Sequence, residues 1–592
     1  MKLNKNNNNP INHEKNINEL KSLSLDISES NNIGLNSDIL EYSNIIYTLF
    51  VNHYNFLVDN KTFYNRDRLI IGKVDIDPVL YAAYFLSGAE GDIKDLENLE
   101  YLEENYNYFK KIPDALSYSV GASIGEAHIS SLLNINSVSY KIYGICQFNA
   151  LSNGINIESA RFAGENKLNN LIIITVGDSS VKELYESLGF NVYSALNEHD
   201  SIDKALNDAK KSDKPSLIII DKLNIDFDIT NISEIKNKLG VRDIKFAISN
   251  DVMEDIQYLI NEREKNLEKN FKDSIASLTP ESSLILKSLI LTNKRVSSSN
   301  IVFIPNDGAS TLDNSNKLLE SYIKNSNNLI FASTNLKEYG SISDSQIFNS
   351  NNYKGATINL ENNLYSSGFI INGLTESGLR PVLETNAKTA RYFIPAVCYA
   401  RHVSLPVIYI LVNDKDDNQD ISYLRETTDI DMFTPFDANE VIGSFKAVMN
   451  KEEEVSVILV TREESKISES SSINDTARGA YILLNERLSF DGTIICSSSS
   501  VNLAVSVREI LFSRGLDYRI VSCPNIKRFL KQSEEYKDKV LPVEKRKIII
   551  ENSNSTYWNR VVFNNKYILN YKDFKTFSYD AKKFADKIEK LK

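Results

Sequence analysis

The chain alternates short apolar runs with amphipathic stretches over most of its length. The runs are strand-length, rich in Ile and Val, and continuous, as in strands covered by helices on both faces. They are KIYGIC, NLIIITV, PSLIIID, SNIVFIP, LPVIYILV, VSVILVT, GTIICSS, YRIVSCP and KIIIEN. Helical patterns such as DSIDKALNDAKKSD separate them. The repeated strand-helix-strand order predicts an α/β fold with mostly parallel sheets flanked by helices.

Two breaks divide this pattern into three domains. Strand-like runs stop over residues 241–294, where DVMEDIQYLINEREKNLEKNFKDSIASL predicts a charged helical linker. The second break is EESKISESSSINDT, and we expect a Ser-rich linker at 466–477. The domains are then expected at 38–240, 295–465 and 478–592, after an Asn-rich disordered tail at 1–37.

Composition narrows the class of protein. The net charge is −12, from 67 basic and 79 acidic residues, which argues against nucleic-acid and anionic-membrane partners. No apolar run reaches membrane-spanning length, and the first residues contain no apolar signal-peptide core. The four cysteines form no CxxC pair, so a disulfide framework or zinc site is not expected. We expect a cytoplasmic multi-domain protein.

Several strings, in order along residues 38–560, resemble the transketolase family. The segment GTIICSSSSVNLAVSVREILFSRGLDYRIVSCPNIKRFLKQSEEYKDKVLP is similar to the C-terminal domain of that family. YNRDRLIIGK, EHDSIDKALNDAKKSDKPSLIIIDK and SLPVIYILVND followed by PFDANEV resemble further family segments. The resemblance implies a diphosphate-binding (PP), a pyrimidine-binding (Pyr) and a C-terminal domain. It also implies a homodimer with active sites between the subunits.

The metal and diphosphate site that the resemblance implies is damaged. The family holds thiamine diphosphate through Mg or Ca, because buried phosphates need a compensating cation. Asn153 and Gly154 align with the family's Glu-Gly pair, which places Phe148 at the Asp ligand of its Gly-Asp-Gly motif. Asp178 aligns with the Asn ligand, but a single carboxylate does not make a hard-ion site. We interpret Asp178 as a turn residue and expect no bound cofactor.

The catalytic glutamate of the family has two candidate positions. The alignment without a gap, anchored on Asn372 and Gly373, places Leu364 there and is the simpler one. A three-residue insertion would place Glu361 there instead. Of the aromatic residues that cradle the pyrimidine ring in the family, only one has a counterpart in this chain, Tyr392. Asn386 and Thr389 replace two Phe residues.

Histidines that the family uses for substrate hydroxyls and proton transfer are also missing. Asp75 aligns with one of them, and the loops after PSLIIIDKLNI and at NDKDDNQDISYLRE are shortened. The chain has five histidines in all. His13 falls in the expected tail, and His199 precedes a helix away from the family's chemistry. His53, His128 and His402 fit packing or surface roles.

Some positions of the family persist. Gly121 in YSVGASIG matches a glycine of a cofactor-facing turn, and Asp307 in PNDGAS matches an Asp near the cofactor. Arg462 matches an Arg that grips the sugar phosphate. Because the family residues that would act with them are missing, ordinary structural roles explain each better: a turn glycine, a capping Asp and a surface Arg.

Two functions follow from this pattern. The first is a non-catalytic transketolase homologue, acting as a scaffold, a homodimer, or a heterodimer subunit with an active paralogue. The second is an active, diverged transketolase of the pentose phosphate pathway, moving a two-carbon ketol unit between sugar phosphates with thiamine diphosphate and Mg or Ca. The simultaneous loss of metal, pyrimidine and hydroxyl contacts favours the first.

Overall fold

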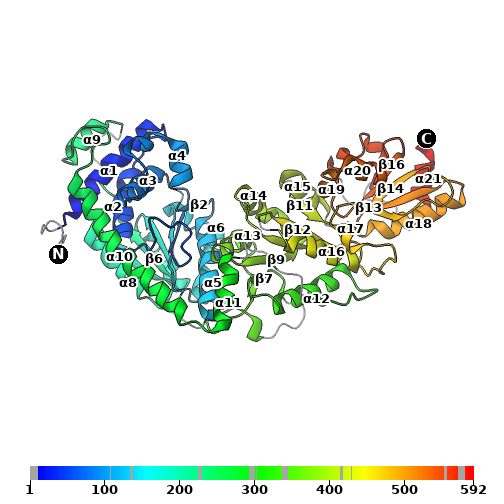
Figure 1. Ribbon diagram of the computed structural model, residues 1–592, viewed down its shortest axis with the longest axis horizontal. Helices are drawn as coiled ribbons and strands as arrows, with labels where there is room; N and C mark the ends of the chain where they lie inside the picture. Colours follow the sequence, from blue (N-terminus) through cyan, green and yellow to red (C-terminus); the bar gives the residue numbers. More distant parts are fainter. Residues whose placement is uncertain are drawn as a thin grey trace. The chain divides into compact units, whose positions relative to one another are not determined.

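A computed structural model describes the chain from residue 11 to residue 591. It excludes residues 107, 134–137, 225–229, 292–295, 297–300, 302, 337–343, 414–417, 429, 452, 552–555 and 571–579. The chain divides into two compact units, Met1–Leu286 with Asn349–Lys354, and Lys287–Phe348 with Gly355–Lys592 (Figure 1). The described residues contain three sheets, one in the first unit and two in the second.

The first unit is built on six parallel strands in the order β2-β1-β3-β4-β6-β5. The strands are β1 (Arg68–Ile71), β2 (Lys110–Lys111), β3 (Ile142–Ile145), β4 (Leu171–Val176), β5 (Asn191–Ala195) and β6 (Ser216–Ile220). The helices are α1 (His13–Ser30), α2 (Asp38–Thr48), α3 (Asp77–Leu86), α4 (Leu99–Asn105), α5 (Ala115–Leu133), α6 (Gly154–Glu165), α7 (Lys182–Ser187), α8 (His199–Lys210), α9 (Ile232–Lys238) and α10 (Asn250–Ala276). This confirms the strands expected at KIYGIC, NLIIITV and PSLIIID.

Both faces of this sheet are covered, which explains the continuous apolar runs. Alternate side chains such as Tyr143 and Ile145 join a core with α1, α2, α3 and α10. On the opposite face α5 lies so close that a Cβ on Gly144 would meet Ser119 Oγ at 2.8 Å. Figure 1 shows α1, α2 and α3 grouped on one side of the sheet, away from α5.

The expectation of a disordered tail over residues 1–37 is wrong for residues 13–30, which form helix α1. Leu20, Leu23 and Ile27 are buried in the core of the unit. A polar residue of α1 is also fixed in this unit, because the Asp26 carboxylate accepts a hydrogen bond from Lys236 Nζ at 2.7 Å. The Asn- and Ser-rich composition concealed this apolar stripe. Residues 1–10 lie outside the described residues.

The second unit begins with a sheet of six parallel strands in the order β11-β12-β10-β9-β7-β8. The strands are β7 (Leu329–Ser333), β8 (Thr357–Asn359), β9 (Arg380–Asn386), β10 (Ile408–Asn413), β11 (Asp431–Phe433) and β12 (Ser456–Thr461). The helices are α12 (Thr311–Lys324), α13 (Ser367–Leu374), α14 (Ile394–His402), α15 (Asn418–Thr428) and α16 (Ala438–Met449). The strand expected at SNIVFIP does not form among its described residues, and Ile304 there is 84% exposed.

The last sheet has five strands in the order β13-β15-β14-β16-β17, and β13 is antiparallel to β15. The strands are β13 (Tyr481–Leu484), β14 (Gly492–Cys496), β15 (Tyr518–Ser522), β16 (Arg546–Glu551) and β17 (Ile568–Asn570). The helices are α17 (Ile473–Thr476), α18 (Ser500–Ser513), α19 (Ile526–Leu530), α20 (Glu534–Val540) and α21 (Ala581–Lys590). Within this unit the buried Glu440 of α16 accepts from Tyr481 Oη at 2.8 Å, which links α16 to strand β13 of the last sheet.

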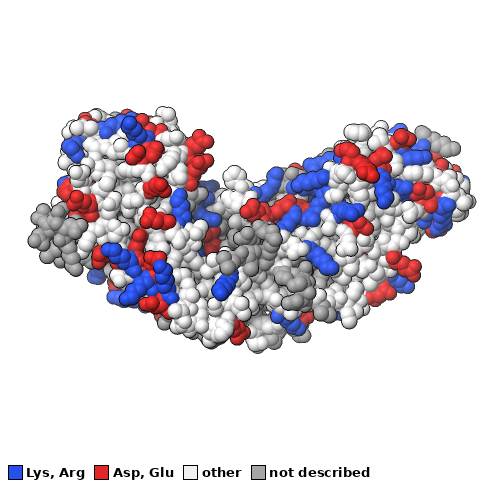
Figure 2. Space-filling model, in the orientation of Figure 1, with Lys and Arg blue, Asp and Glu red and all other residues white. Residues whose placement is uncertain are grey.

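The stretch between the first and second sheets is helical, as the sequence predicts. Helix α10 has 27 residues, and α11 (Pro280–Leu291) contains the boundary between the units. Among the described helices, none is long and apolar enough to cross a bilayer. On the face shown in Figure 2, basic and acidic side chains both occur over each unit.

Candidate functional site

A cavity lies at the carboxyl edge of the first sheet, where open parallel sheets usually bind ligands. Its volume is about 280 Å³. Gly72 and Lys73 follow β1, and Cys146 and Gln147 follow β3. Residues 113–116 at the start of α5, and Asn149, Ala150, Asn153, Ile155 and Asn156 before and within the start of α6, complete its lining. Gln147, Asn149 and Asn153 of this lining belong to the stretch that the family alignment assigns to the diphosphate.

Phe148 directly follows this edge, in the short 3₁₀ helix Phe148–Ala150. Its ring lies against Gly177, which follows β4. A Cβ on Gly177 would lie 2.1 Å from Phe148 Cδ2, so only glycine permits this contact. The place of the expected metal-binding Asp thus holds carbon atoms, which offer no ligand to a hard cation.

Asp178, the other aligned metal position, caps a 3₁₀ helix at Ser179–Val181. Its Oδ1 accepts from the Ser180 backbone N–H at 2.8 Å. Hydrogen bonds from Ser180 hold the pKa of this exposed carboxyl below its ordinary value. Within the part of the chain that is described, no three His, Cys, Asp or Glu residues are grouped to hold a metal ion.

Two buried acceptors line the same cavity. Asp114 Oδ2 and Asn156 Oδ1 accept no hydrogen bond from any described residue. Burial raises the pKa of Asp114 to about 6, so its carboxyl is largely ionised at neutral pH. A phosphate group beside these oxygens would meet acceptors instead of donors, which is unfavourable in a buried site. With Phe148 at the ligand position, the residues present do not fit a metal-bound diphosphate.

Gly121 lies inside the unbroken 19-residue helix α5. It is buried, and its φ is not in the positive range adopted by turn glycines. The prediction of a cofactor-facing turn at Gly121 is therefore wrong. The run YSVGASIG contains no helix-terminating residue, so its two glycines are absorbed into the helix.

In the second unit, the two candidates for the catalytic glutamate lie in a turn after β8. Glu361 is exposed, and its backbone N–H donates to Asn359 Oδ1 at 3.0 Å. Leu364 is half-buried three residues before α13. The structure does not distinguish between the two alignments, and the catalytic role of Glu361 stays a prediction.

Tyr392 lies in the 3₁₀ segment Ala387–Phe393 and is 39% exposed. Its ring centroid is 4.5 Å from that of Tyr365. The residues that replace the family's two Phe rings have local polar roles. Asn386 Oδ1 accepts from the Lys388 N–H at 2.9 Å, and the Thr389 hydroxyl lies 2.9 Å from that of Thr385. These two residues stabilise the backbone and offer no ring for stacking.

Asp307 and Arg462 lie on neighbouring segments at the carboxyl end of β12. Asp307 is exposed, and its Oδ1 accepts from the Ile467 N–H at 2.8 Å. A bridge between Ser310 and Glu464 joins the same two segments. Arg462 is exposed. Asp307 therefore connects its loop to the segment after β12 instead of capping its own turn, and a place near a cofactor stays a prediction.

The histidines do not gather at the candidate site. His13, expected in the tail, stacks on His199 with ring centroids 3.9 Å apart. His53 and His128 are buried, and His402 is exposed, in accord with packing and surface roles. Parts of the two shortened loops, at 225–229 and 414–417, lie outside the described residues.

Comparison with known protein families gives two matches. Residues 112–290 match the family model "Transketolase, thiamine diphosphate binding domain", and residues 479–589 match "Transketolase-like TK C-terminal domain". The first match includes Phe148 and every residue of the cavity lining except Gly72 and Lys73, and the second spans the last sheet.

Curated relatives and solved structures agree with these matches. A transketolase of Staphylococcus epidermidis is 24% identical, covering 92% of this chain and 93% of its own. One of Halalkalibacterium halodurans is 24% identical, covering 93% and 92%. The structure of the transketolase from Leishmania mexicana superposes with a TM-score of 0.87 at 20% identity, covering 98% of each chain. The Pichia stipitis transketolase in complex with sedoheptulose 7-phosphate gives 0.87 at 21%, covering 98% and 97%.

Proposed function

The chain belongs to the transketolase family, and on that premise we propose that it is a non-catalytic member. It keeps the three-domain fold while binding no thiamine diphosphate and transferring no ketol group. The expected division into a PP domain at 38–240, a Pyr domain at 295–465 and a C-terminal domain at 478–592 is part of this proposal. Fold membership alone does not settle activity, because function depends on the site.

The contact between Phe148 and Gly177 carries the proposal. The family chemistry depends on a cation that neutralises the diphosphate, and that cation needs oxygen ligands. In this chain the aligned ligand is an aromatic ring packed onto the next strand end. The unpartnered oxygens of Asp114 and Asn156 add repulsion toward phosphate.

A non-catalytic member acts through its fold and its partners. We propose that the chain assembles as a cytoplasmic homodimer, or as a heterodimer with an active paralogue. In the second case it would contribute one half of a shared site or block it. The resemblance to a family with sites between subunits supports this assembly.

One observation favours the alternative, an active and diverged transketolase. The 12-residue helix α6 begins at the cavity, and its N-cap residue Asn153 makes no side-chain capping bond. Lys73 lines the same cavity. A free helix N-terminus beside a lysine attracts anions. Under this alternative, sugar phosphates are the substrates, Glu361 activates the cofactor and Arg462 holds the substrate phosphate. Gly121, Asp307 and Tyr392 are not enough to support that chemistry.

A ketol-transfer assay separates the two functions. The purified protein is given thiamine diphosphate, Mg²⁺, and a ketose and an aldose phosphate, and product formation is followed. We expect no turnover above that of the buffer. Turnover that depends on both thiamine diphosphate and Mg²⁺ would overturn the proposal. The same assay on an active transketolase chain from the same organism, with and without this protein, tests the partner role.

A further inference from the structure

A second, larger cavity lies at the opposite edge of the first sheet. Its volume is about 850 Å³, within the range of small-molecule sites. Lys141 and Asn170 line it and directly precede β3 and β4, so this is the amino edge of the sheet. The remaining lining comes from the second half of α5, residues 139–140, Asn169 and Tyr353, all within the first unit. We call it the Glu126 cavity.

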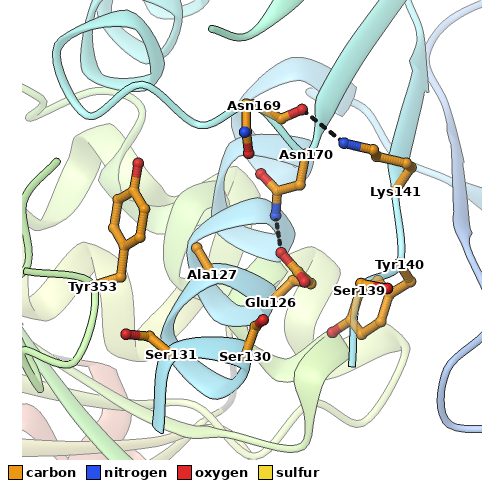
Figure 3. A pocket seen from close by; sticks show the side chains of 10 residues that line it. All are labelled: Glu126, Ala127, Ser130, Ser131, Ser139, Tyr140, Lys141, Asn169, Asn170 and Tyr353. Atoms are coloured by element: carbon orange, nitrogen blue, oxygen red, sulfur yellow. Dashed lines mark hydrogen bonds between the residues drawn. The ribbon is translucent and has the colours of Figure 1, made fainter. Parts of the chain in front are cut away.

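Glu126 is the buried acidic residue of this cavity (Figure 3). Its side chain projects from α5, and the residue is only 6% exposed. Asn170 Nδ2 donates to Glu126 Oε2 at 2.5 Å. The other carboxyl oxygen, Oε1, accepts no hydrogen bond from any described residue, and no basic group within 4 Å pairs with it in that part of the chain. This oxygen is not among the fully buried, unpartnered oxygens of the described residues, so a ligand in the cavity can contact it.

The Asn170 amide is held in one orientation by Ser123. The Ser123 hydroxyl donates to Asn170 Oδ1, and Asn170 Nδ2 donates to the Ser123 carbonyl at 2.9 Å. The amide must therefore present its N–H to Glu126, and it fixes that carboxyl group. Hydrogen bonds that fix a binding residue in one orientation, as these do for Glu126, preorganise a binding site.

The charge of the cavity depends on the state of Glu126. Burial raises its pKa to about 8, although the Asn170 hydrogen bond and the positive charges of Lys141 and Arg68 oppose the shift. Asp67 raises the pKa further. At neutral pH the carboxyl group is then mostly protonated and donates a hydrogen bond through its free oxygen.

Lys141 is the basic residue that lines the cavity, and burial lowers the pKa of its ammonium group while the carboxyl groups of Glu126 and Asp67 oppose that shift. Its Nζ donates to the Asn169 carbonyl at 3.0 Å, as drawn in Figure 3, which leaves two further N–H groups. Ser130, Ser131 and Ser139 add hydroxyl groups to the lining. A single positive charge among neutral hydroxyl and amide groups suits an anion that also carries hydroxyls.

We propose that the Glu126 cavity binds a small hydroxylated anion, a sugar acid or a sugar-type phosphate. Lys141 contacts the anionic group, while the free Glu126 oxygen and the serine hydroxyls contact the ligand hydroxyls. This site lies across the sheet from Phe148 and does not depend on whether the chain is catalytic. The aligned cofactor region is not part of it.

The test is calorimetric titration of the full-length protein at pH 7 with gluconate, glycerol 3-phosphate and uncharged glucitol. We expect at least one of the two anions to bind saturably and about tenfold more tightly than glucitol. Which anion binds more tightly identifies the carboxylate or the phosphate class. Lys141→Met should weaken that binding about tenfold or more, whereas Lys182→Met, which removes an exposed lysine on α7, should leave it unchanged.

A pH series with Glu126→Gln separates a ligand role from a structural one. Wild-type affinity should fall roughly tenfold from pH 7 to pH 9 as Glu126 ionises, because the bound form needs the proton. Gln keeps the hydrogen bond from Asn170 and cannot ionise, so this part of the pH dependence should disappear. Tyr64 and Tyr353, which sense the Glu126 charge, are present in both proteins. Saturable binding by neither anion, or equal pH profiles of the two proteins, would overturn the proposal.

Discussion

At the scale of single residues, the contact of Phe148 with Gly177 is the observation on which the proposed loss of metal-bound diphosphate rests. The two residues follow neighbouring strands, so their side chains meet at one sheet edge. The alignment located Phe148 and Asp178 because motif spacing is a local property. It could not reveal Gly177, Asp114 or Asn156, because their significance depends on what lies across the cavity.

We expect Gly177→Ala to destabilise the protein by about 1–3 kcal/mol, because the added Cβ would overlap the Phe148 ring. In a Phe148→Ala background the same change should cost less than about 0.5 kcal/mol. Urea unfolding of the four proteins in this double-mutant cycle measures the difference. An equal cost in both backgrounds would show that the ring does not occupy the space above Gly177.

At the scale of elements, helix α1 is part of the core and not a tail. The sequence indicated otherwise because Asn, Ser and Lys outnumber its apolar residues. What the composition hid is a set of buried polar contacts. Lys236 of α9 is 2% exposed and pairs with Asp26 of α1, whose carboxylate also accepts from the Phe246 N–H at 2.8 Å.

We expect Lys236→Met to destabilise the protein by about 3–5 kcal/mol, because it leaves the Asp26 carboxylate buried without its partner. The matched control is Lys238→Met on the same helix. It removes an exposed pair with Glu234, at 3.1 Å, and should cost less than about 0.5 kcal/mol. Thermal melting followed by circular dichroism compares them. If the two variants melt alike, the buried pair does not hold α1 in place.

At the scale of the whole molecule, the α/β architecture was predictable because helices cover both faces of parallel strands and force continuous apolar runs. β3, β4 and β10 show this directly. β9 was missed because Pro381 and Glu384 interrupt its run, and β5 because its residues are half-buried and mixed. SNIVFIP has the apolar composition of a strand, but its described residues form none, because an apolar run alone does not determine whether it pairs with another strand.

The candidate site was less predictable than the fold. The family alignment pointed to Phe148 and Asp178, which both follow strands of the first sheet, but it assigned Gly121 to a turn although this residue lies within helix α5. The Glu126 cavity was not predicted at all. It joins residues from α5, from two strand starts and from the 349–354 segment, and nothing in their sequence spacing brings them together. A buried Glu within an apolar helix is the only local signal of this site.

The most direct test of the central claim is calorimetric titration of the purified protein with thiamine diphosphate in the presence of Mg²⁺. If Phe148 and the unpartnered oxygens of Asp114 and Asn156 exclude a metal-bound diphosphate, no saturable heat should appear into the millimolar range. Saturable, Mg²⁺-dependent binding with a micromolar dissociation constant would contradict the account and favour an active transketolase.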